Sequence, residues 1–201
     1  MAATELKTSG YTSETAERYL LNAGALFKNV KYNSEKQKYE GEPLGATVGG
    51  SKCNITINLR QPEVDGVLAK IKGNDLIESV EATIEGTLKE WKKENIAQAL
   101  FADVAEGNGT EDATGYKIIT GRNEVLAKDY VENIAYVGKI SGEDKPVIII
   151  LKNAINTNGL SFETKDKDEA GIPFKFEARA DADKPEDVNK IWKIIYPETS
   201  V

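Results

Sequence analysis

Residues 76–101 read LIESVEATIEGTLKEWKKENIAQALF, and two different periods meet within them. In the first half apolar and polar residues alternate, and the apolar ones share one face: Val80, Ala82, Ile84, Gly86 and Leu88. A period of two is that of a β-strand, so this half predicts a long strand with one buried face and one wet, acidic face. After Trp91 the apolar residues Ile96, Leu100 and Val104 recur every four positions, which predicts a short amphipathic helix.

The rest of the chain is dominated by strand patterns and tight turns. Alternating or continuous apolar segments predict strands at residues 19–30, 53–59, 116–120, 129–141, 146–152, 160–165, 174–178 and 191–196. The one helix is expected near residues 94–101, with its Ile96 and Leu100 side packed on the sheets. Many strands with one helix indicate a mainly β fold. We predict an antiparallel β-sandwich or barrel with one short flanking α-helix, in a single domain over residues 1–201.

Four connecting segments stand out between the predicted strands. Residues 1–18 are polar and predict a flexible N-terminal arm. Residues 60–75 form a long loop around a short apolar patch, and loops of this length are usually functional or bound to a partner. Residues 103–115 predict a flexible connection, and residues 156–159 an Asn-Gly hairpin turn. We expect the arm and the long loop to become ordered only on contact with a neighbouring subunit.

The composition narrows the range of functions. The net charge of −7 argues against sequence-independent binding of nucleic acid, which needs a basic surface. The absence of histidine removes the commonest general base and the commonest zinc ligand, which lowers the expectation of an enzyme. The single cysteine, Cys53, excludes an internal disulfide. No apolar run approaches the length of a membrane span.

The stretch quoted above also carries a family resemblance. Residues 78–83, followed by 91–100, resemble the core signature of bacteriophage major tail proteins, the subunits of the tail tube. Agreement in order and spacing extends from about Tyr19 to Pro197, through the following segments: 22–27, 45–50, 64–67, 72–73, 172–178 and 192–197. Relatives usually open the helix with Thr-Pro, whereas Lys92 and Lys93 stand here. Two cations at a positive helix end are unfavourable, so either the helix begins late or the lysines face an acidic partner.

The resemblance implies a structural protein without enzymatic activity or cofactor. Subunits of that family join sheet edges in hexameric rings, and the rings stack into a tube through which DNA passes without specific binding. Implied partners are further copies and the tape-measure, terminator and baseplate proteins. The implied location is the virion tail, assembled in the cytoplasm of the host bacterium, with no membrane contact. The resemblance makes the long loop an inter-subunit contact, with these candidate residues: Pro62, Val64, Asp65, Val67 and Leu68.

Glu81 and Glu85 share the polar face of the long strand, and this face has two interpretations. It is either a solvated sheet face or, on the family resemblance, part of an acidic surface shared by several subunits. An acidic lumen would repel the DNA backbone, because it offers no cation to replace the counterions of the phosphates. On the second interpretation, Glu81 and Glu85 are the candidate lumen-facing residues.

Other functions remain open on the sequence. A tube protein of a contractile bacteriocin or secretion system would look much the same. A monomeric carbohydrate- or ligand-binding sandwich would use exposed aromatic residues, with Trp91 and Trp192 as candidates. A carboxylate-based enzyme is the weakest alternative. Residues 166–171 together with Glu177 have calcium-loop spacing, but alanine at the fifth position and an internal proline favour a solvated turn. Cys53 lies in an apolar alternation, which favours a small core residue over a nucleophile.

Overall fold

The computed structural model describes residues 8–198, so residues 1–7 of the predicted N-terminal arm lie outside the described part. Strands make up most of the regular structure of the described residues, and their single α-helix is α1 (Lys93–Ala99). The strands are β1 (Leu20–Asn33), β2 (Lys38–Pro43), β3 (Thr47–Arg60), β4 (Leu76–Leu88), β5 (Ala102–Glu106), β6 (Lys117–Gly121), β7 (Val131–Ile140), β8 (Val147–Asn156), β9 (Ile172–Glu177) and β10 (Trp192–Ile195). Three short 3₁₀ helices are η1 (Thr15–Glu17), η2 (Ala127–Asp129) and η3 (Pro185–Asp187).

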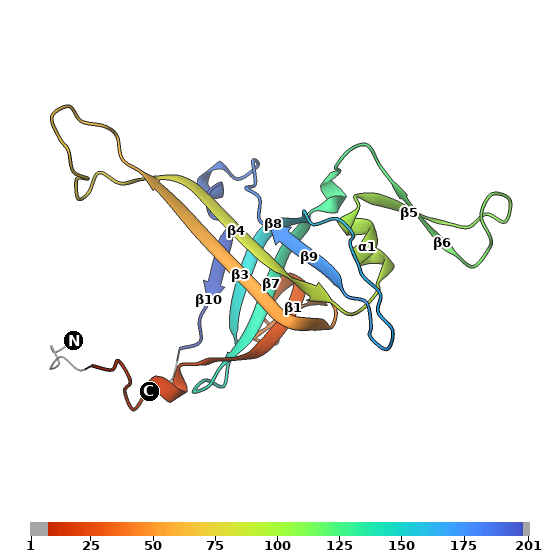
Figure 1. Cartoon of the computed structure of the whole chain (residues 1–201), viewed down its shortest axis with the longest axis horizontal. Coiled ribbons are helices and arrows are strands. Elements are labelled where there is room, and N and C mark those ends of the chain that lie inside the picture. Colours follow the sequence, from red (N-terminus) through yellow and green to blue (C-terminus); the bar gives the residue numbers. More distant parts are fainter. Residues whose placement is uncertain (1–7, 199–201) are drawn as a thin grey trace.

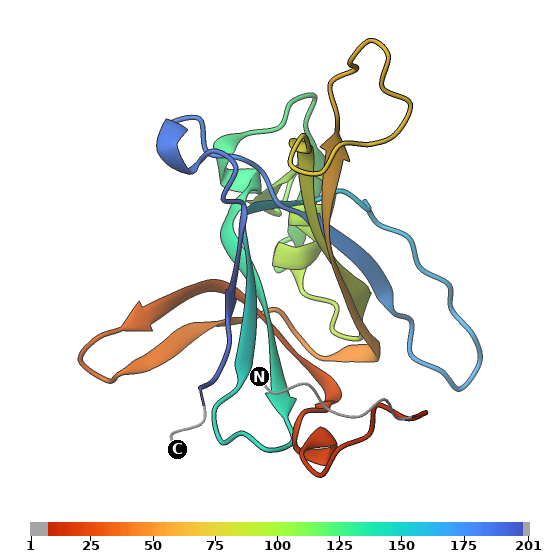
Figure 2. The same ribbon diagram turned by 90° about the vertical axis from the view of Figure 1, so that its left-hand side faces the viewer.

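Two antiparallel layers meet at β8 (Figures 1 and 2). The first sheet runs β2-β1-β7-β8, with β10 added to β8 at residues 148–151. The second sheet runs β3-β4-β9, and β9 pairs with β8 at residues 155–156. β8 therefore belongs to both sheets. The predicted fold class, a mainly β antiparallel sandwich with one short helix, is confirmed.

The main core lies between these two layers. From β4, the residues Ala82, Ile84 and Leu88 are buried, as their alternation predicts. They meet buried side chains of β9 and of the first sheet, including Phe174, Phe176, Ile134 and Leu151. The predicted long strand with one buried face is therefore confirmed.

The first sheet also has apolar side chains on its other face. Ile148 and Ile150 of β8 form a second buried cluster with Val30 and Ala135, while Leu151 belongs to the main core. The apolar run at the start of β8 therefore contributes to clusters on both faces of its sheet, as a continuous apolar strand should.

The helix corrects the prediction at its C-terminal end. α1 ends at Ala99, because Phe101 adopts the left-handed backbone conformation (φ 49°) that terminates helices. Its buried residues are Asn95, Ala97 and Ala99, whereas Leu100 is 40% exposed. The prediction that Leu100 packs on the sheets was wrong, although half-buried Ile96 does contact the main core.

This correction gives a testable expectation. Leu100→Ala should lower the free energy of unfolding by less than about 1 kcal/mol, because the side chain is already largely in water. Ile84→Ala, at a fully buried position of β4, should cost about 2–5 kcal/mol. Urea denaturation of the two variants measures the contrast, and equal losses would contradict the placement of Leu100.

The start of the helix shows which groups lie beside the two lysines within one chain. Lys92 is the N-cap residue and forms no side-chain capping hydrogen bond. Its Nζ atom lies 2.7 Å from Glu90 Oε2, and Lys93 Nζ lies 3.3 Å from Glu94 Oε1. The lysines thus pair with acidic neighbours on the same chain.

Two connecting segments differ from the prediction. Residues 103–115 were expected to be a flexible connection, but β5 begins at Ala102 and pairs with β6 in a separate two-stranded hairpin. Val104, assigned to the helix by its spacing, lies in β5. The predicted hairpin turn at 156–159 and strand at 160–165 are also wrong, because residues 157–171 form one long connection without a strand. Asn156 itself pairs with Phe176 of β9, so the partner strand comes later in the chain.

The described part of the N-terminal arm is tied to the turn after β7. Gly142 donates its backbone N–H to Glu17 O at 2.7 Å, and Ser141 Oγ donates to Ala16 O at 2.5 Å. Arg18 also pairs with Glu14. Residues 14–18 therefore have contacts within one subunit, which the prediction of order only on assembly did not include.

Candidate functional site

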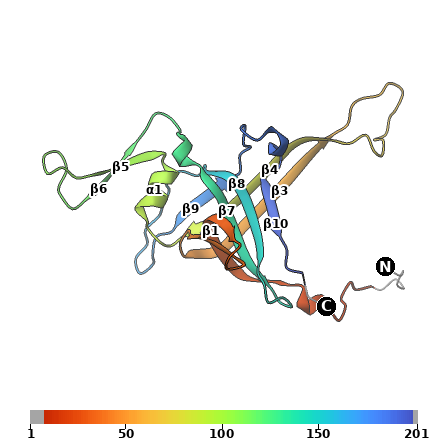
Figure 3. The ribbon, with the colours of Figure 1, turned by 180° about the vertical axis from the view of Figure 1, so that it is seen from behind.

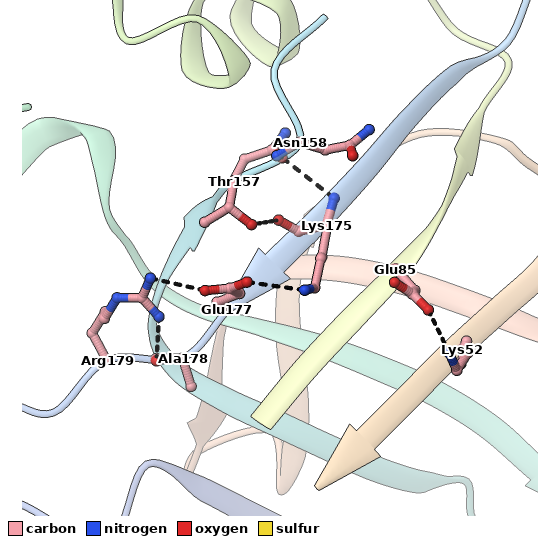
Figure 4. Close-up of polar contacts among 9 residues, drawn as sticks. Lys52, Glu85, Thr157, Asn158, Lys175, Glu177, Ala178 and Arg179 are labelled. Carbon is pink, nitrogen blue, oxygen red and sulfur yellow. Dashed lines mark hydrogen bonds and ion pairs between the residues drawn. The ribbon is translucent and has the colours of Figure 1, made fainter. Parts of the chain in front are cut away.

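The polar face of the second sheet carries a row of alternating charges (Figure 4). Antiparallel register places Glu85 of β4 between Lys52 of β3 and Lys175 of β9. Lys52 Nζ lies 2.8 Å from Glu85 Oε1. Because all three side chains come from neighbouring strands at one level, they lie on the same face of the sheet.

A second acidic group continues this row at the end of β9. Lys175 Nζ lies 3.1 Å from Glu177 Oε1, and Arg179 Nη2 lies 2.9 Å from Glu177 Oε2 (Figure 4). Arg179 Nη1 also donates to Ala178 O at 3.0 Å. Glu177 is therefore held between two cations.

These contacts shift the pKa values of the paired groups on this face so that their charged forms are favoured. The hydrogen bond that Lys52 donates to Glu85, together with the charge of Lys52, lowers the pKa of Glu85, and the same hydrogen bond raises the pKa of Lys52. Hydrogen bonds from Arg179 and then Lys175 lower the pKa of Glu177. Each shift favours the charged form, so these pairs are ionised near neutral pH. Ion pairs this close to water add little to stability.

The face is charge-balanced, which corrects the prediction of an acidic face. The face has three glutamates and three cations. The glutamates are Glu81, Glu85 and Glu177, and the cations are Lys52, Lys175 and Arg179. The alternation within β4 revealed only that strand's own acids. The cations come from β3 and from the end of β9, so their proximity depends on strand pairing that the sequence did not specify. Whether Glu81 and Glu85 line a lumen stays a prediction.

The loop between β3 and β4 projects beyond the body of the molecule (Figures 1 and 3). All five candidate contact residues are exposed: Pro62, Val64, Asp65, Val67 and Leu68. The base of the loop is closed by Gln61, whose Nε2 donates to Asp75 Oδ1 at 2.7 Å and whose Oε1 accepts from Ile71 N at 3.0 Å. The loop therefore has a defined base and presents its apolar residues to solvent.

Exposed apolar side chains continue from the loop down the hairpin that carries it. Leu68 is fully exposed, and four strand residues below it are also largely in water: Ile57, Leu59, Leu76 and Ile77. Leu59 and Ile77 are cross-strand partners, and exposed apolar residues gathered on one hairpin in this way indicate an interaction surface. Sequence analysis singled out the loop but missed these strand residues.

The other candidate residues make contacts within the chain, and Trp91 is 45% exposed. Trp91 makes an edge-to-face contact with Phe162 at 4.7 Å between ring centroids, and its Nε1 donates to Ala170 O at 3.1 Å. Trp192 packs against the main core. Cys53 is half-buried against the same core, and burial raises the pKa of its thiol, which disfavours the nucleophilic thiolate.

Neither a metal site nor a membrane helix is found in the described part of the chain. No group of three or more metal-ligating side chains gathers within residues 8–198. Asp168, in the segment with calcium-loop spacing, instead lies 3.4 Å from Lys89 Nζ. No helix in this range is long and apolar enough to cross a membrane.

A buried ion pair beside the β5–β6 hairpin was not anticipated. Arg122 and Asp129, with side chains 10% and 5% exposed, approach to 2.5 Å between Nη2 and Oδ1. Asp129 Oδ2 also accepts the N–H of Leu126 at 2.7 Å, which closes the turn into η2. The sequence signal was a lone arginine seven residues before an aspartate, and such spacing has no helical or strand period.

Comparison with known protein families and with curated proteins found no match to this chain.

Proposed function

We propose that the chain is the repeating subunit of a self-assembled tube of the phage tail type, built from stacked hexameric rings. The observation that carries the proposal is the projecting β3–β4 hairpin, whose apolar side chains are left in water by a single chain. A second copy that covers this surface would bury it, and removal of apolar surface from water is the main driving force of association.

The edge of the second sheet supports the same proposal. β3 has fourteen residues and ends the strand order, so its outer edge has no partner strand within the described chain. A long open edge is an association hazard unless it is covered, and a closed ring of identical subunits covers every edge. In this arrangement β3, β4, β9 and the end of β8 form one subunit's share of a continuous wall.

The charge-balanced face suits the inner wall of such a tube. Each cation there is paired with a carboxylate, so the face offers phosphates no unpaired cluster of positive charge. DNA is the proposed cargo, with tape-measure, terminator and baseplate proteins as further partners and the virion tail as location. The same wall would serve the tube of a contractile bacteriocin or secretion system, and neighbouring capsid or sheath genes distinguish these cases.

The direct test is the behaviour of the purified protein. Sedimentation velocity across a wide concentration range should show association beyond the monomer, and negative-stain microscopy should show rings or tubes with an open centre. A chain that stays monomeric throughout, with no tubes on the grid, would overturn the proposal.

A variant tests the inner wall. Glu81→Lys/Glu85→Lys replaces two acids, and in β4 it places a new cation between Lys52 and Lys175. In virions whose tubes remain intact, we expect DNA release to slow by about tenfold at low salt and less at high salt, because confined charges act on the phosphates and salt screens them.

The matched control changes the same number of charges elsewhere. Glu35→Lys/Glu42→Lys alters two exposed acids of the β1–β2 hairpin, which lies outside the second sheet. This control should release DNA at the wild-type rate. Wild-type release from the Glu81/Glu85 variant at every salt concentration would place these glutamates away from the DNA.

A further inference from the structure

The β5–β6 hairpin, called the β5–β6 arm below, pairs with no other strand of the described chain. It forms its own two-stranded sheet and extends from the body at the end opposite the long loop (Figures 1 and 3). An isolated two-stranded hairpin is marginally stable in water. Val104 and Tyr116 are largely exposed on it. Residues 102–121 contain four acidic residues and one lysine, which gives this arm a net charge of −3.

A basic hollow lies on another part of the same chain. Its volume is about 550 Å³, and it lies beside β8, β10 and the segment around η3. Two acidic residues line it, Glu132 and Asp181, against five basic ones: Lys152, Arg179, Lys184, Lys190 and Lys193. Its net charge is therefore +3, in a chain whose total is −7.

An apolar surface adjoins this basic hollow. Lys152, Lys190 and Lys193 also border a second hollow of about 530 Å³, which Trp192 and Ile77 help to line. The basic hollow and its neighbour thus combine positive charge with apolar side chains. The arm offers the opposite charge together with its own exposed apolar residues, so the two surfaces are complementary in both respects.

The two surfaces face different ways on one molecule. The arm points to one end of the molecule in Figure 1, and the view from the other end in Figure 2 has β10 in front. A protrusion and a complementary hollow that face apart cannot meet within one chain. Between copies they form a heterologous contact, which closes into a ring when the rotation between neighbours permits.

We propose that the β5–β6 arm of one copy docks in the basic hollow of the next copy. The inference rests on the proposed self-assembly and names a contact for it: acidic arm tip against Lys190 and Lys193, with apolar arm residues beside Trp192. The occupant is a second copy of this chain rather than a nucleic acid, because the chain itself carries an arm of matching opposite charge.

Two charge-reversal variants test the contact. Glu111→Lys/Asp112→Lys reverses the arm tip, and Lys190→Glu/Lys193→Glu reverses the hollow; all four residues are exposed. Each variant alone should self-associate at least about tenfold more weakly than wild type, because like charges then face each other. Combining both changes in one chain should restore association. Circular dichroism and thermal unfolding check that each variant is folded.

Mixing the two variants separates this contact from tube formation. Unlike chains can then pair in two ways, wild-type arm with wild-type hollow and reversed arm with reversed hollow, so the mixture should associate in equal proportions by sedimentation even where no tube forms. The control is Glu35→Lys/Asp144→Lys, which changes the net charge by the same amount as the arm variant but at turns outside the arm and the hollow. This control should associate like wild type.

Each outcome bears on one claim. If the arm-reversed chain and the hollow-reversed chain each form tubes as readily as wild type, the arm contact is overturned and the proposed function stands. Association of the two chains in the mixture in equal proportions, without tubes from wild type, would support the contact and overturn the proposed function. A duplex oligonucleotide that binds wild type at physiological salt but not the Lys190/Lys193 variant, with association unchanged, would assign the hollow to nucleic acid and overturn the proposal.

Discussion

Leu68→Asp is expected to leave the monomer folded and to abolish assembly into rings and tubes. Leu68 is fully exposed at the tip of the projecting loop, so the substitution removes no packing from the monomer. In an assembly its side chain would be buried against a neighbour, and a carboxylate buried without a partner is strongly unfavourable. Sedimentation velocity and negative-stain microscopy measure the loss, and thermal unfolding of the monomer should stay within about 0.5 kcal/mol of wild type.

The control for this variant is another exposed apolar residue, outside the hairpin. Val125 is 47% exposed in the turn that precedes η2. Val125→Asp introduces the same charge and should assemble like wild type. Tubes from Leu68→Asp that match those of the control in number and length would show that the loop tip makes no contact between subunits.

Asp129→Ala is expected to lower the free energy of unfolding by about 3–5 kcal/mol. The substitution leaves the buried guanidinium of Arg122 without its closest carboxylate, and it removes the acceptor of the Leu126 N–H. Within the described chain, Arg122 Nη1 already lacks a hydrogen-bond partner, and the carboxylate that remains nearby, Asp103, is largely exposed. Urea denaturation measures the effect.

Two variants show whether burial of the charge is the cause. Asp103 also approaches Arg122, with 3.3 Å from Nε to Oδ1, but its side chain is 54% exposed. Asp103→Ala should therefore cost no more than about 1 kcal/mol. Arg122→Met/Asp129→Leu removes both charges and should recover most of the lost stability. A double variant as unstable as Asp129→Ala would attribute the loss to packing instead.

Local periodicity predicted those elements whose burial is decided within one segment. The alternation in β4 identified its buried residues, because each side chain's face follows from the pleat alone. The apolar run of β8 likewise predicted burial on both faces. Periodicity failed where a single backbone angle decided the outcome: Phe101 ends the helix, so Val104 moves from a helical face to a strand.

The candidate site depended on pairing between distant segments, which limited its prediction. The long loop was recognised from its own composition, and its five residues are exposed as a contact loop requires. The charge balance of the sheet face was missed, because Lys175 reaches the level of Glu85 only through the register of β9 on β4. The basic hollow was missed for the same reason, since its lysines come from β8, from β10 and from the segments on either side of η3.

The double membership of β8 has a consequence for the order of events during synthesis. Of the layer that opposes the inner face of β4, only β1 and β2 have been made before β7 and β8 emerge from the ribosome, and the neighbour β9 follows only at residues 172–177. Most contacts of the sandwich join distant segments, which makes folding slow and late. A nascent chain therefore keeps the edges of β4 and β8 that pair with β9 open until β9 has been made. Chaperones that shield such strands should bind the growing chain and release it once β9 has paired.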